Sequence, residues 1–360
     1  METIRLGILT WRKGPYVEEK TYFTHLAKEA QKWNTEVILF SPNDVLNAGK
    51  IRALYYEPGK GWIDKICPPP HVVYDRFRNM QQAAFKQFIR FREQSKWIFL
   101  NSRLAHKWNL YRFMQQNQQI QRWLPETLFL ENPKDALGLL KKYHSIYLKP
   151  VNGTGGKGIL SISKQSNGPL QVLGRNNQRK KVKAVFNSIP SLVSFIKNWT
   201  GDAKYIAQQG LELEWDHGLV TDFRLLVQKD GSGQWTVTGL GGKIGGKNSA
   251  TSNLHGGGKA IPPEVFLRRY FPEEKRNLLY EECNKLGLVV AEYLEEKFGR
   301  LLELGIDLGI DKEGKVWIIE VNNKPGRDIF KQMGDTDTYL KAVRRPIEYA
   351  RYIYEGNRDG

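Results

Sequence analysis

The sequence predicts an α+β protein in which a small α/β domain precedes a larger domain of mixed strands and helices. Near the N-terminal end, apolar runs of strand length alternate with stretches of helical periodicity, which is the pattern of a β-α-β unit. Further along, apolar strands are joined in pairs by short turns, as in antiparallel hairpins. A chain of 360 residues is long enough to bury the cores of two such domains.

The first domain is predicted to span residues 1–101. Its short apolar runs are typical of buried strands in a parallel sheet, and the segments between them have helical spacing. The expected strands are residues 4–10, 36–40, 71–77 and 97–101, and the expected helices lie near 20–33 and 79–94.

The second domain is predicted to span residues 102–355. Its helices are expected at about 103–117, from 132 onwards, and at 191–199, 273–298 and 336–355. Its strands are expected at 124–130, on both sides of a glycine-rich turn within 145–164, and at 204–213, 220–228, 235–242, 301–311 and 316–322. The polar, basic segment 175–183 lies between apolar strands, so it is expected to form a solvated hairpin.

The chain is strongly basic, with 55 Lys and Arg against 38 Asp and Glu and a net charge of +17. This excess predicts attraction to polyanions such as nucleotides, acidic peptides or nucleic acid. No nucleic-acid-binding motif accompanies it, so a specific nucleic-acid partner is not expected. Two cysteines argue against a disulfide framework, and neither a membrane-spanning run nor a signal peptide is recognisable. A cytoplasmic protein is therefore expected.

The segment WIIEVNNKPG at 317–326 places one carboxylate, Glu320, among apolar residues that are expected to be buried. Because side chains alternate along a strand, Glu320 and Asn322 are expected on the same face. The turn at 311–315 joins this strand to the preceding one, which brings Asp307 opposite them. Two carboxylates and an amide oxygen at one point are ligands that suit Mg²⁺ or Mn²⁺. A hairpin with ordinary surface acids is the alternative, which the apolar neighbours of Glu320 disfavour.

A second feature is the glycine-rich segment LKPVNGTGGKGI at 148–159. Glycines let the backbone approach an anion closely and direct N–H groups at it. A Walker P-loop is excluded, because its motif requires Gly at 151 and Ser or Thr at 158, where the chain has Val151 and Gly158. A hairpin that closes over phosphates is therefore expected, and a plain glycine turn is the alternative. The candidate phosphate-binding residues are Lys149, Gly153, Gly155, Gly156, Lys157 and Gly158.

Two further strands and one loop carry polar residues that suit a nucleotide site. Amide and backbone groups at the end of the strand before residue 211 can bind the edge of adenine, and the residues concerned are Gln208, Gln209, Gly210 and Leu211. On the strand at 221–227, Asp222 and Arg224 share one face, so Arg224 is a candidate phosphate or carboxylate ligand, with an ion pair to Asp222 as the alternative. The glycine-rich loop at 241–262 offers further candidate contacts, which are Lys243, Asn253 and His255. An isolated loop histidine is an equally good interpretation of His255.

The order of these features resembles that of the ATP-grasp superfamily: a strand lysine with a glycine loop, a glutamine-bearing hinge strand, a D-x-R strand, and a carboxylate hairpin that ends E-x-N-x-x-P-G. Here the last motif is IEVNNKPG, and Asp307 lies thirteen residues before Glu320. The likeness extends over roughly residues 101–330. With the segments IRLGILTWRKGPYVEEK and VVYDRF of the first domain, the chain is similar to the YheC/YheD family, whose members are described as endospore coat-associated.

The resemblance implies specific roles. Within 102–355, a lid subdomain at about 125–207 and a metal and substrate subdomain at 208–355 are expected to enclose ATP. The resemblance assigns the phosphates of ATP to Lys107 and Lys149, and its adenine and ribose to Gln208, Gln209, Gly210, Leu211 and Glu214. It assigns two Mg²⁺ ions to Asp307, Glu320 and Asn322, and catalysis to Arg224, Lys243 and Asn253.

The resemblance further implies ATP-dependent ligation, in which a substrate carboxylate becomes an acyl phosphate and an amine then displaces phosphate, so that ADP and phosphate are formed. The positive net charge favours a carboxylate-bearing small molecule or an acidic peptide as the substrate. Spore-coat proteins as partners, and association with the spore coat, rest on the resemblance alone. The rival interpretations are an ATP-binding or structural coat protein without turnover and an ATP-dependent kinase.

Overall fold

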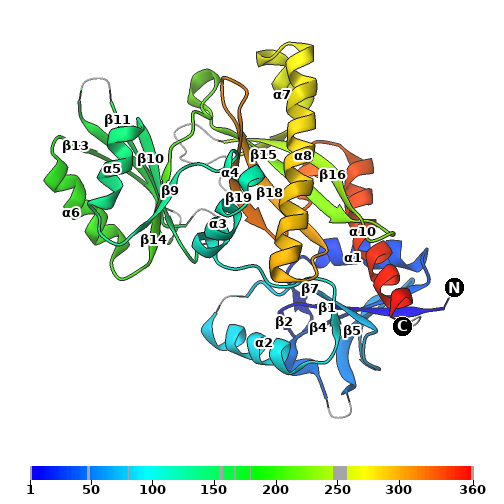
Figure 1. Cartoon of the computed structure of the whole chain (residues 1–360). Coiled ribbons are helices and arrows are strands. Elements are labelled where there is room, and N and C mark those ends of the chain that lie inside the picture. The colour runs from blue at the N-terminus through cyan, green and yellow to red at the C-terminus, as the bar shows by residue number, and fades with distance from the viewer. Residues whose placement is uncertain are drawn as a thin grey trace.

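The computed structural model describes residues 2–46, 49–79, 81–153, 157–165, 168–178, 180–245 and 258–357. In these residues the strands form two six-stranded sheets, a five-stranded sheet and a two-stranded ribbon. The first sheet and the second sheet lie on different sides of the third sheet, along which the long helix α8 (Glu273–Phe298) runs (Figure 1). The mixture of helices and sheets confirms the predicted α+β class.

The first sheet has the strand order β6-β5-β4-β1-β7-β8. Strands β1, β4, β7 and β8 are parallel, as the β-α-β pattern predicts. The sequence does not predict the antiparallel hairpin β5–β6, because β6 is an edge strand in which only Cys67 is buried and which has no apolar alternation. The elements are β1 (Ile4–Leu9), α1 (Lys20–Gln31), β4 (Thr35–Phe40), β5 (Ile51–Glu57), β6 (Gly61–Cys67), β7 (Val72–Asp75), α2 (Gln82–Gln94) and β8 (Ile98–Phe99). The ribbon is formed by β2 (Arg12–Lys13) and β3 (Tyr16–Val17).

The second sheet is antiparallel, with the order β13-β12-β11-β10-β14-β9. Helices α5 and α6 share a core with its buried residues, including Ile146, Leu148 and Ile162. The predicted solvated hairpin is confirmed between β12 and the edge strand β13. The elements are β9 (Thr127–Leu130), α5 (Asp135–Lys142), β10 (Ser145–Pro150), β11 (Ile159–Lys164), β12 (Leu170–Arg175), β13 (Lys181–Phe186), α6 (Ile189–Thr200) and β14 (Tyr205–Gln209).

The third sheet has the order β17-β16-β15-β18-β19. Helix α8 packs closely on it, since a Cβ at Gly287 would lie 2.7 Å from Leu225 Cδ2. The strands are β15 (Thr221–Lys229), β16 (Trp235–Ile244), β17 (Lys259–Ile261), β18 (Glu303–Ile310) and β19 (Val316–Asn322). The other helices are α3 (Lys107–Gln115), α4 (Gln118–Gln121), α7 (Pro263–Tyr270), α9 (Asp328–Gln332) and α10 (Thr336–Gly356).

The boundary expected near residue 101 falls between β8 and α3, and the division expected at 207 falls within β14.

The C-terminal helix α10 packs against the N-terminal part of the chain. Helix α10 returns from the third sheet to pack against α1 and the first sheet, with Val343 and Ile347 in the same core as Leu6 and Leu26. Of the helices in the described part of the chain, none combines the length and apolar character that crossing a membrane requires.

Candidate functional site

A β-bulge sets the geometry of the carboxylate hairpin. Near its turn, Leu308 of β18 pairs with Ile318 of β19, and continuation of that register would place Asp307 opposite Ile319. The register shifts between Asp307 and Leu308, so that Asp307 pairs with Glu320 instead. The two carboxylates therefore face each other as predicted, but only because of the extra residue in β19.

The same bulge turns Glu320 away from the core. In a strictly alternating strand Ile318, Glu320 and Asn322 would share one face, and Ile318 is a core residue. The bulge reverses the alternation, so that the next core residue is Val321. The apolar neighbours Ile318 and Val321 are buried, as expected, but Glu320 keeps 43% of its side chain exposed and is not a buried acid.

Asp307 is held by two cations. The guanidinium of Arg224 donates from Nε to Asp307 Oδ1 at 2.8 Å and from Nη2 to Oδ2 at 3.0 Å. Lys243 Nζ lies 2.8 Å from the same Oδ1. Burial alone would raise the pKa of Asp307, but the charges of Arg224 and Lys243 outweigh it and hold that pKa well below its usual range. Asp307 is therefore ionised at physiological pH.

Three adjacent strands carry these charges in alternation. Arg224 of β15 lies directly opposite Asp307 of β18, and Asp222 lies opposite Lys243 of β16. Lys243 Nζ is 2.6 Å from Asp222 Oδ1, so this lysine joins the two carboxylates. Arg224 directs its bidentate contact to Asp307 rather than to the neighbouring Asp222.

Two lysines approach the hairpin from other elements. Lys107, the first residue of α3, places Nζ 2.9 Å from Glu320 Oε1. Lys149 of β10 donates from Nζ to Gln208 Oε1 at 2.5 Å. Burial, followed by the charge of Lys107, lowers the pKa of Lys149 to about 8. An anion bound beside Lys149 would offset both effects.

The hinge strand β14 ends at Gln209, earlier than the predicted residue 213. Gln208 is buried, and its Nε2 donates to Thr127 Oγ1 at 2.9 Å while its Oε1 accepts from Lys149. This arrangement favours a role for Gln208 in orienting Lys149. Glycine is required at 210, because a Cβ there would lie 1.9 Å from Ser145 Oγ.

The residues that follow lie outside the sheet. Leu211 is half-buried, whereas Glu214 is exposed. Burial and, to a smaller extent, the charge of Glu214 raise the pKa of Tyr147, which places this acid near β10. Leu211 and Glu214 therefore border the end of β14, where adenine and ribose are expected.

The glycine loop joins β10 to the antiparallel β11, so the predicted hairpin is confirmed and no helix follows the loop. A Cβ at Gly153 would lie 2.4 Å from the proline that ends β10, and Gly158 has a φ of +70°. The Gly158 carbonyl accepts hydrogen bonds from Trp199 Nε1 at 3.2 Å and from Tyr205 OH at 3.1 Å. Lys157 is exposed. Four candidate residues lie outside the described residues, namely Gly155, Gly156, Asn253 and His255.

The oxygen atoms of the hairpin fit a divalent cation chemically. Across the described ranges no group of three or more His, Cys, Asp and Glu side chains could hold one. A cation at this hairpin would therefore have to take Asn322 as a ligand beside Asp307 and Glu320. Asn322 Oδ1 accepts a hydrogen bond from the backbone N–H of Lys324 at 2.9 Å, which fixes its direction. Asp307 is paired with Arg224 and Lys243, and Glu320 is paired with Lys107. A divalent cation bound to the carboxylate oxygens would replace these basic side chains, which could then bind phosphates.

A cluster of buried charges that no sequence pattern predicted lies next to the turn that follows the hairpin. Arg76 Nη1 lies 3.0 Å from Glu303 Oε1, and Arg327 pairs with the second oxygen of the same carboxylate. Both arginines also donate to the Pro325 carbonyl, at 3.0 and 3.2 Å. The signals in the sequence are the arginine of VVYDRF and the arginine after the Pro-Gly turn. This buried arginine cluster (Arg76, Arg327 and Glu303) fixes the turn after Asn322 to the first sheet.

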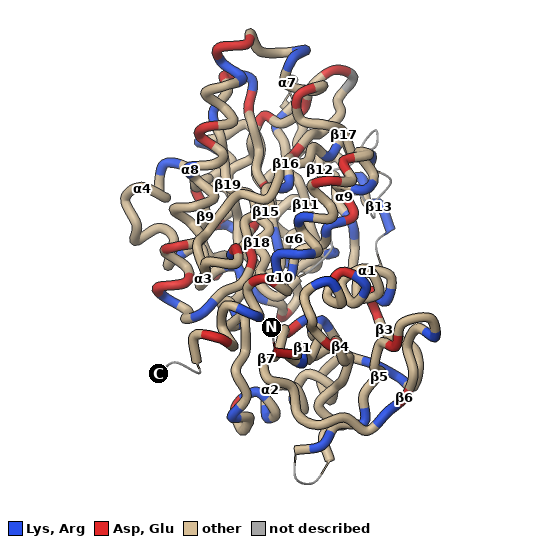
Figure 2. The backbone as a smooth tube through the Cα atoms, turned by 90° about the vertical axis from the view of Figure 1, so that its right-hand side faces the viewer, with Lys and Arg blue, Asp and Glu red and all other residues tan. Residues whose placement is uncertain are grey.

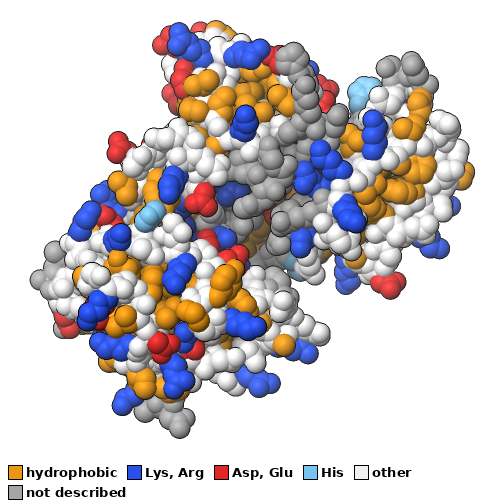
Figure 3. Space-filling model, turned by 180° about the vertical axis from the view of Figure 1, so that it is seen from behind, with side chains coloured by type: hydrophobic (Ala, Val, Ile, Leu, Met, Phe, Trp, Pro, Cys, Tyr) orange, Lys and Arg blue, Asp and Glu red, His pale blue; other side chains and the backbone are white. Residues whose placement is uncertain are grey.

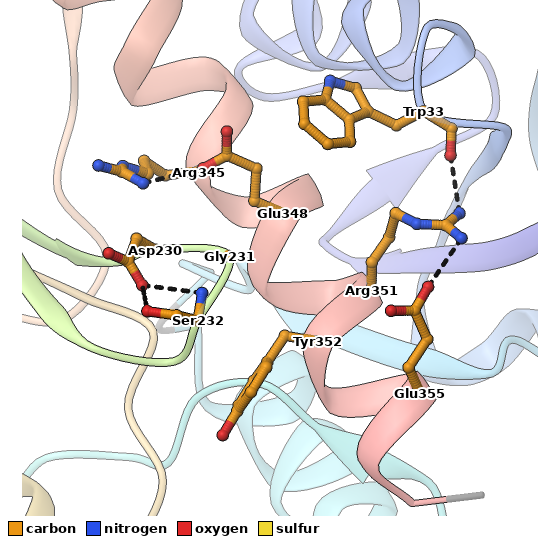
Figure 4. Close-up of a pocket in the computed structure, with 9 residues that line it drawn as sticks. All are labelled: Trp33, Asp230, Gly231, Ser232, Arg345, Glu348, Arg351, Tyr352 and Glu355. Carbon is orange, nitrogen blue, oxygen red and sulfur yellow. Dashed lines mark hydrogen bonds and ion pairs between the residues drawn. The ribbon is translucent and has the colours of Figure 1, made fainter. Parts of the chain in front are cut away.

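Seen from behind, the surface is hollowed beside the part of the molecule that carries the second sheet, and Lys and Arg lie along that edge (Figure 3). A different pocket, of about 350 Å³, lies between α10 and the turn from β15 to β16 (Figure 4). Charged side chains of this pocket already have hydrogen-bond partners within the protein. Arg351, for example, donates to the Trp33 carbonyl at 2.7 Å and to Glu355 at 2.9 Å. None of the predicted site residues lines it, so it is not the candidate site.

Comparison with known sequences gives related proteins over most of the chain. A sequence model of the YheC/D like ATP-grasp family matches residues 96–353. The chain is 28% identical to the endospore coat-associated protein YheD of Bacillus subtilis (strain 168), over 95% of this chain and 76% of that protein. It is 26% identical to YheC of the same organism, over 86% of each. A tetrahydromethanopterin:alpha-L-glutamate ligase of Methanocaldococcus jannaschii is 22% identical over 97% of this chain and 100% of that protein.

Solved structures share the fold at low sequence identity. The D-alanine-D-alanine ligase from Coxiella burnetii matches with a TM-score of 0.52 and 9% identity, over 99% of this chain and 98% of that one. The N5-carboxyaminoimidazole synthetase from Staphylococcus aureus, complexed with ADP, matches with a TM-score of 0.50 and 11% identity, over 91% and 74%. Together with the family match, these likenesses confirm the predicted ATP-grasp fold.

Proposed function

The chain belongs to the YheC/D-like ATP-grasp family, and on this basis we propose that it is an ATP-dependent ligase that joins a substrate carboxylate to an amine. The observation that carries the proposal is the alternation of charges around Asp307. Arg224 and Lys243 hold this carboxylate, and Lys107 holds Glu320 across from it. In such a site, Mg²⁺ can replace the basic side chains as the partner of the carboxylates. The phosphates of ATP can then replace the carboxylates as the partners of the basic side chains. The relative from M. jannaschii is named a ligase, which supports the same class of reaction.

We place ATP between the lid and the third sheet. Its adenine would lie at the end of β14, beside Gln209, Leu211 and Glu214. Its phosphates would extend under the glycine loop toward Lys149, which Gln208 orients, and toward Lys107. The S. aureus structure with ADP supports a nucleotide site in this fold.

In the proposed reaction, an oxygen of the substrate carboxylate attacks the γ-phosphorus of ATP, the bond to the bridging oxygen breaks, and ADP leaves. The amine nitrogen then attacks the acyl carbon of the acyl phosphate. The bond from carbon to the phosphate oxygen breaks, phosphate leaves, and the amine loses a proton. Arg224 and Lys243 would offset the negative charge that gathers on the transferring group. Mg²⁺ held by Asp307, Glu320 and Asn322 would neutralise charge on the phosphate oxygens, and we expect two such ions. Mn²⁺ could take their place, because it also prefers oxygen ligands.

The charge of the lid favours an acidic substrate. Residues 127–209 contain 13 Lys and Arg but only three Asp and Glu, and they carry more than half of the net charge. On the edge strand β13, Lys181 and Lys183 are exposed. Lys and Arg are also present along the rest of the backbone, interspersed there with acids (Figure 2). An acidic peptide would be attracted by this field, and we propose it as the carboxylate substrate. Association with spore-coat proteins is proposed from the likeness to YheD and YheC.

The test of the proposed function is ADP formation in the presence of ATP, Mg²⁺ and a pool of amino acids and acidic peptides, with products followed by mass spectrometry. We expect substrate-dependent ADP and a condensed product, both lost in Glu320→Gln. Glu313→Gln is the matched control, because Glu313 is an exposed acid in the turn of the same hairpin.

Other results of this assay would favour one of the alternative functions. Absence of ATP binding at millimolar concentration would overturn the enzyme assignment. ATP binding without turnover under any pool would indicate a structural or binding protein. A stable phosphorylated product would indicate a kinase.

ATP affinity is expected to fall as the pH rises above about 8, because Lys149 has a lowered pKa of about 8 and must be charged to bind phosphate. The sign follows from the ammonium form, which is fully present below this pKa and lost above it. Isothermal titration of ATP between pH 7 and 9.5 should show up to about a tenfold loss per pH unit. In Lys149→Arg, which stays charged, the slope should vanish over the same range. An unchanged slope in this variant would exclude Lys149 as its source.

A further inference from the structure

One face of the second sheet is directed at the candidate site. Helices α5 and α6 pack on the other face, in one core with Leu148 of β10. Side chains alternate along a strand, so Lys149 projects from the opposite face. Burial and then the charge of Lys107 lower the pKa of Lys149, whereas the charges of Glu320 and Asp307 oppose this shift. Because these two acids belong to the carboxylate hairpin, the face that carries Lys149 is directed at that hairpin. We call it the inner face; on β10 to β13 it consists of the odd-numbered residues.

The register of the strands continues the inner face to the outer edge of the sheet. Tyr147 of β10 lies opposite Ser161 of β11. Ser161 lies opposite Leu173 of β12, which in turn lies opposite Lys183 of β13. Paired residues of neighbouring strands project from the same face, so Lys183 shares the face of Lys149. In the strand order β13 is three strand spacings from β10, which corresponds to about 14 Å.

The charge on these strands is of one sign. Strands β10 to β13, all of whose residues are described, contain Lys149, Lys164, Arg175, Lys181 and Lys183 but no Asp or Glu. On β13 the side chains of Lys181 and Lys183 are exposed, and the ion pairs among the described residues include neither of them. A positive charge without an internal partner, on the same face as Lys149, favours an anionic partner.

The edge of the sheet at β13 suits a peptide. In the described part of the chain β13 pairs with β12 alone, so the backbone groups on its outer side have no strand partner. Val185, the next residue of β13 on the inner face, is 56% exposed. An extended peptide binds such an edge through main-chain hydrogen bonds and places alternate side chains beside those of the edge strand. A nucleic acid would match the charge only, because no residue of β13 on the inner face is an aromatic on which a base could stack.

We propose that an acidic peptide docks on the lid as an additional strand beside β13. Two acidic side chains at alternate positions of the peptide lie beside Lys181 and Lys183, and an apolar side chain at the next alternate position lies beside Val185. This docking segment is separate from the residue that reacts, because crossing about 14 Å from β13 to Lys149 takes about four extended residues. The role of the peptide as the substrate rests on the proposed function, whereas its binding to β13 does not.

Exposed lysines on an edge strand have a simpler explanation, which is protection of the edge against self-association. The two roles differ in the effect of a charge reversal. Protection alone predicts that the double variant Lys181→Glu, Lys183→Glu changes self-association but not the affinity for a peptide. Docking predicts that this variant loses affinity for an acidic peptide.

Binding is tested without ATP, by fluorescence anisotropy of the full chain with a labelled, end-blocked peptide that has Glu at two alternate positions and Val at the next. We expect this peptide to bind more tightly than one of the same composition with adjacent Glu residues. Lys181→Glu, Lys183→Glu should weaken binding about tenfold or more, because like charges then lie opposite each other. Lys141→Glu with Lys197→Glu is the matched control, since it makes the same change in net charge at exposed positions of α5 and α6.

Two N-methylated forms of the peptide test the strand pairing itself. The N–H groups of a strand point alternately to its two sides, so methyl groups on one set of alternate residues face β13 and those on the other set face water. Only the first form should lose binding. Equal binding of both forms, equal binding to the charge-reversal and control variants, or binding of an oligonucleotide but of no peptide would each overturn the proposal.

The turnover assay then separates docking from ligation. If ADP forms with a peptide long enough to reach from β13 to Lys149, the charge-reversal variant should raise KM for the peptide at least about tenfold while KM for ATP stays the same. Equal KM values for the peptide in wild type and variant would overturn docking at β13 and leave the ligase standing. Selective binding of the peptide without ADP under any condition would support docking and overturn the ligase.

Discussion

Replacement of Asp307 by asparagine is expected to reduce ADP formation at least about 100-fold and to lower the free energy of unfolding by about 3 kcal/mol. The carboxylate accepts both hydrogen bonds of Arg224 and also pairs with Lys243, and only 16% of its side chain is exposed. An amide of the same shape cannot neutralise these cations. It is also a weaker ligand for a divalent ion.

Glu320→Gln is expected to affect turnover in the same way as Asp307→Asn but to affect stability much less. Glu320 is 43% exposed and its ion pair with Lys107 is partly solvated, so this variant should lose turnover but change the free energy of unfolding by less than about 1 kcal/mol. Urea unfolding and ADP release measured on both variants provide the check. Equal stability of Asp307→Asn and wild type would contradict the description of Asp307 as the partner of two buried cations.

The second large effect is expected at Glu303, which is fully buried in the arginine cluster. Glu303→Gln should lower the free energy of unfolding by about 3 to 5 kcal/mol, because Arg76 and Arg327 lose the charge that they share. Gln228 and Tyr74 also bond to this carboxylate, so the change disturbs a network rather than one pair. Urea unfolding measures the loss.

Glu355→Gln is the matched control, since Glu355 pairs with Arg351 but is 57% exposed, and its effect should stay below about 1 kcal/mol. The cluster also holds the Pro325 carbonyl, so Glu303→Gln should weaken ATP-dependent activity in the surviving folded protein. Full activity together with wild-type stability would show that the cluster is dispensable for both.

Local patterns predicted the elements well where the sequence pattern and the packing agree. The helix at 273–298 was predicted with its observed bounds, and the hairpins β15–β16 and β18–β19 were predicted from their short turns. The hairpin β5–β6 was missed because an edge strand with exposed residues has no apolar alternation to detect. The order of the lysines, the hinge strand, Arg224 and the carboxylates along the sequence also indicates the family, through its resemblance to the ATP-grasp pattern.

The sequence could not determine how the residues of the candidate site are positioned relative to one another. Period-two alternation put Glu320 and Asn322 on one face, but it could not reveal that a bulge at Ile319 turns that face away from the core and brings Glu320 opposite Asp307. A bulge depends on how both sides of the hairpin pack against the rest of the protein, and no local pattern records that.

The contacts between distant elements were likewise decided by tertiary structure. The sequence by itself indicated the α+β class, through the spacing of apolar positions, and the chemical types of the site residues. It indicated the ATP-grasp fold through the resemblance of its motifs to those of that superfamily. Only the folded chain pairs Lys107 with Glu320 and Arg224 with Asp307. Only the folded chain anchors Pro325 to Arg76, which directly follows β7 of the first sheet. Ion pairs and buried hydrogen bonds form wherever packing brings charges together, and their partners in this protein lie on elements far apart in the sequence.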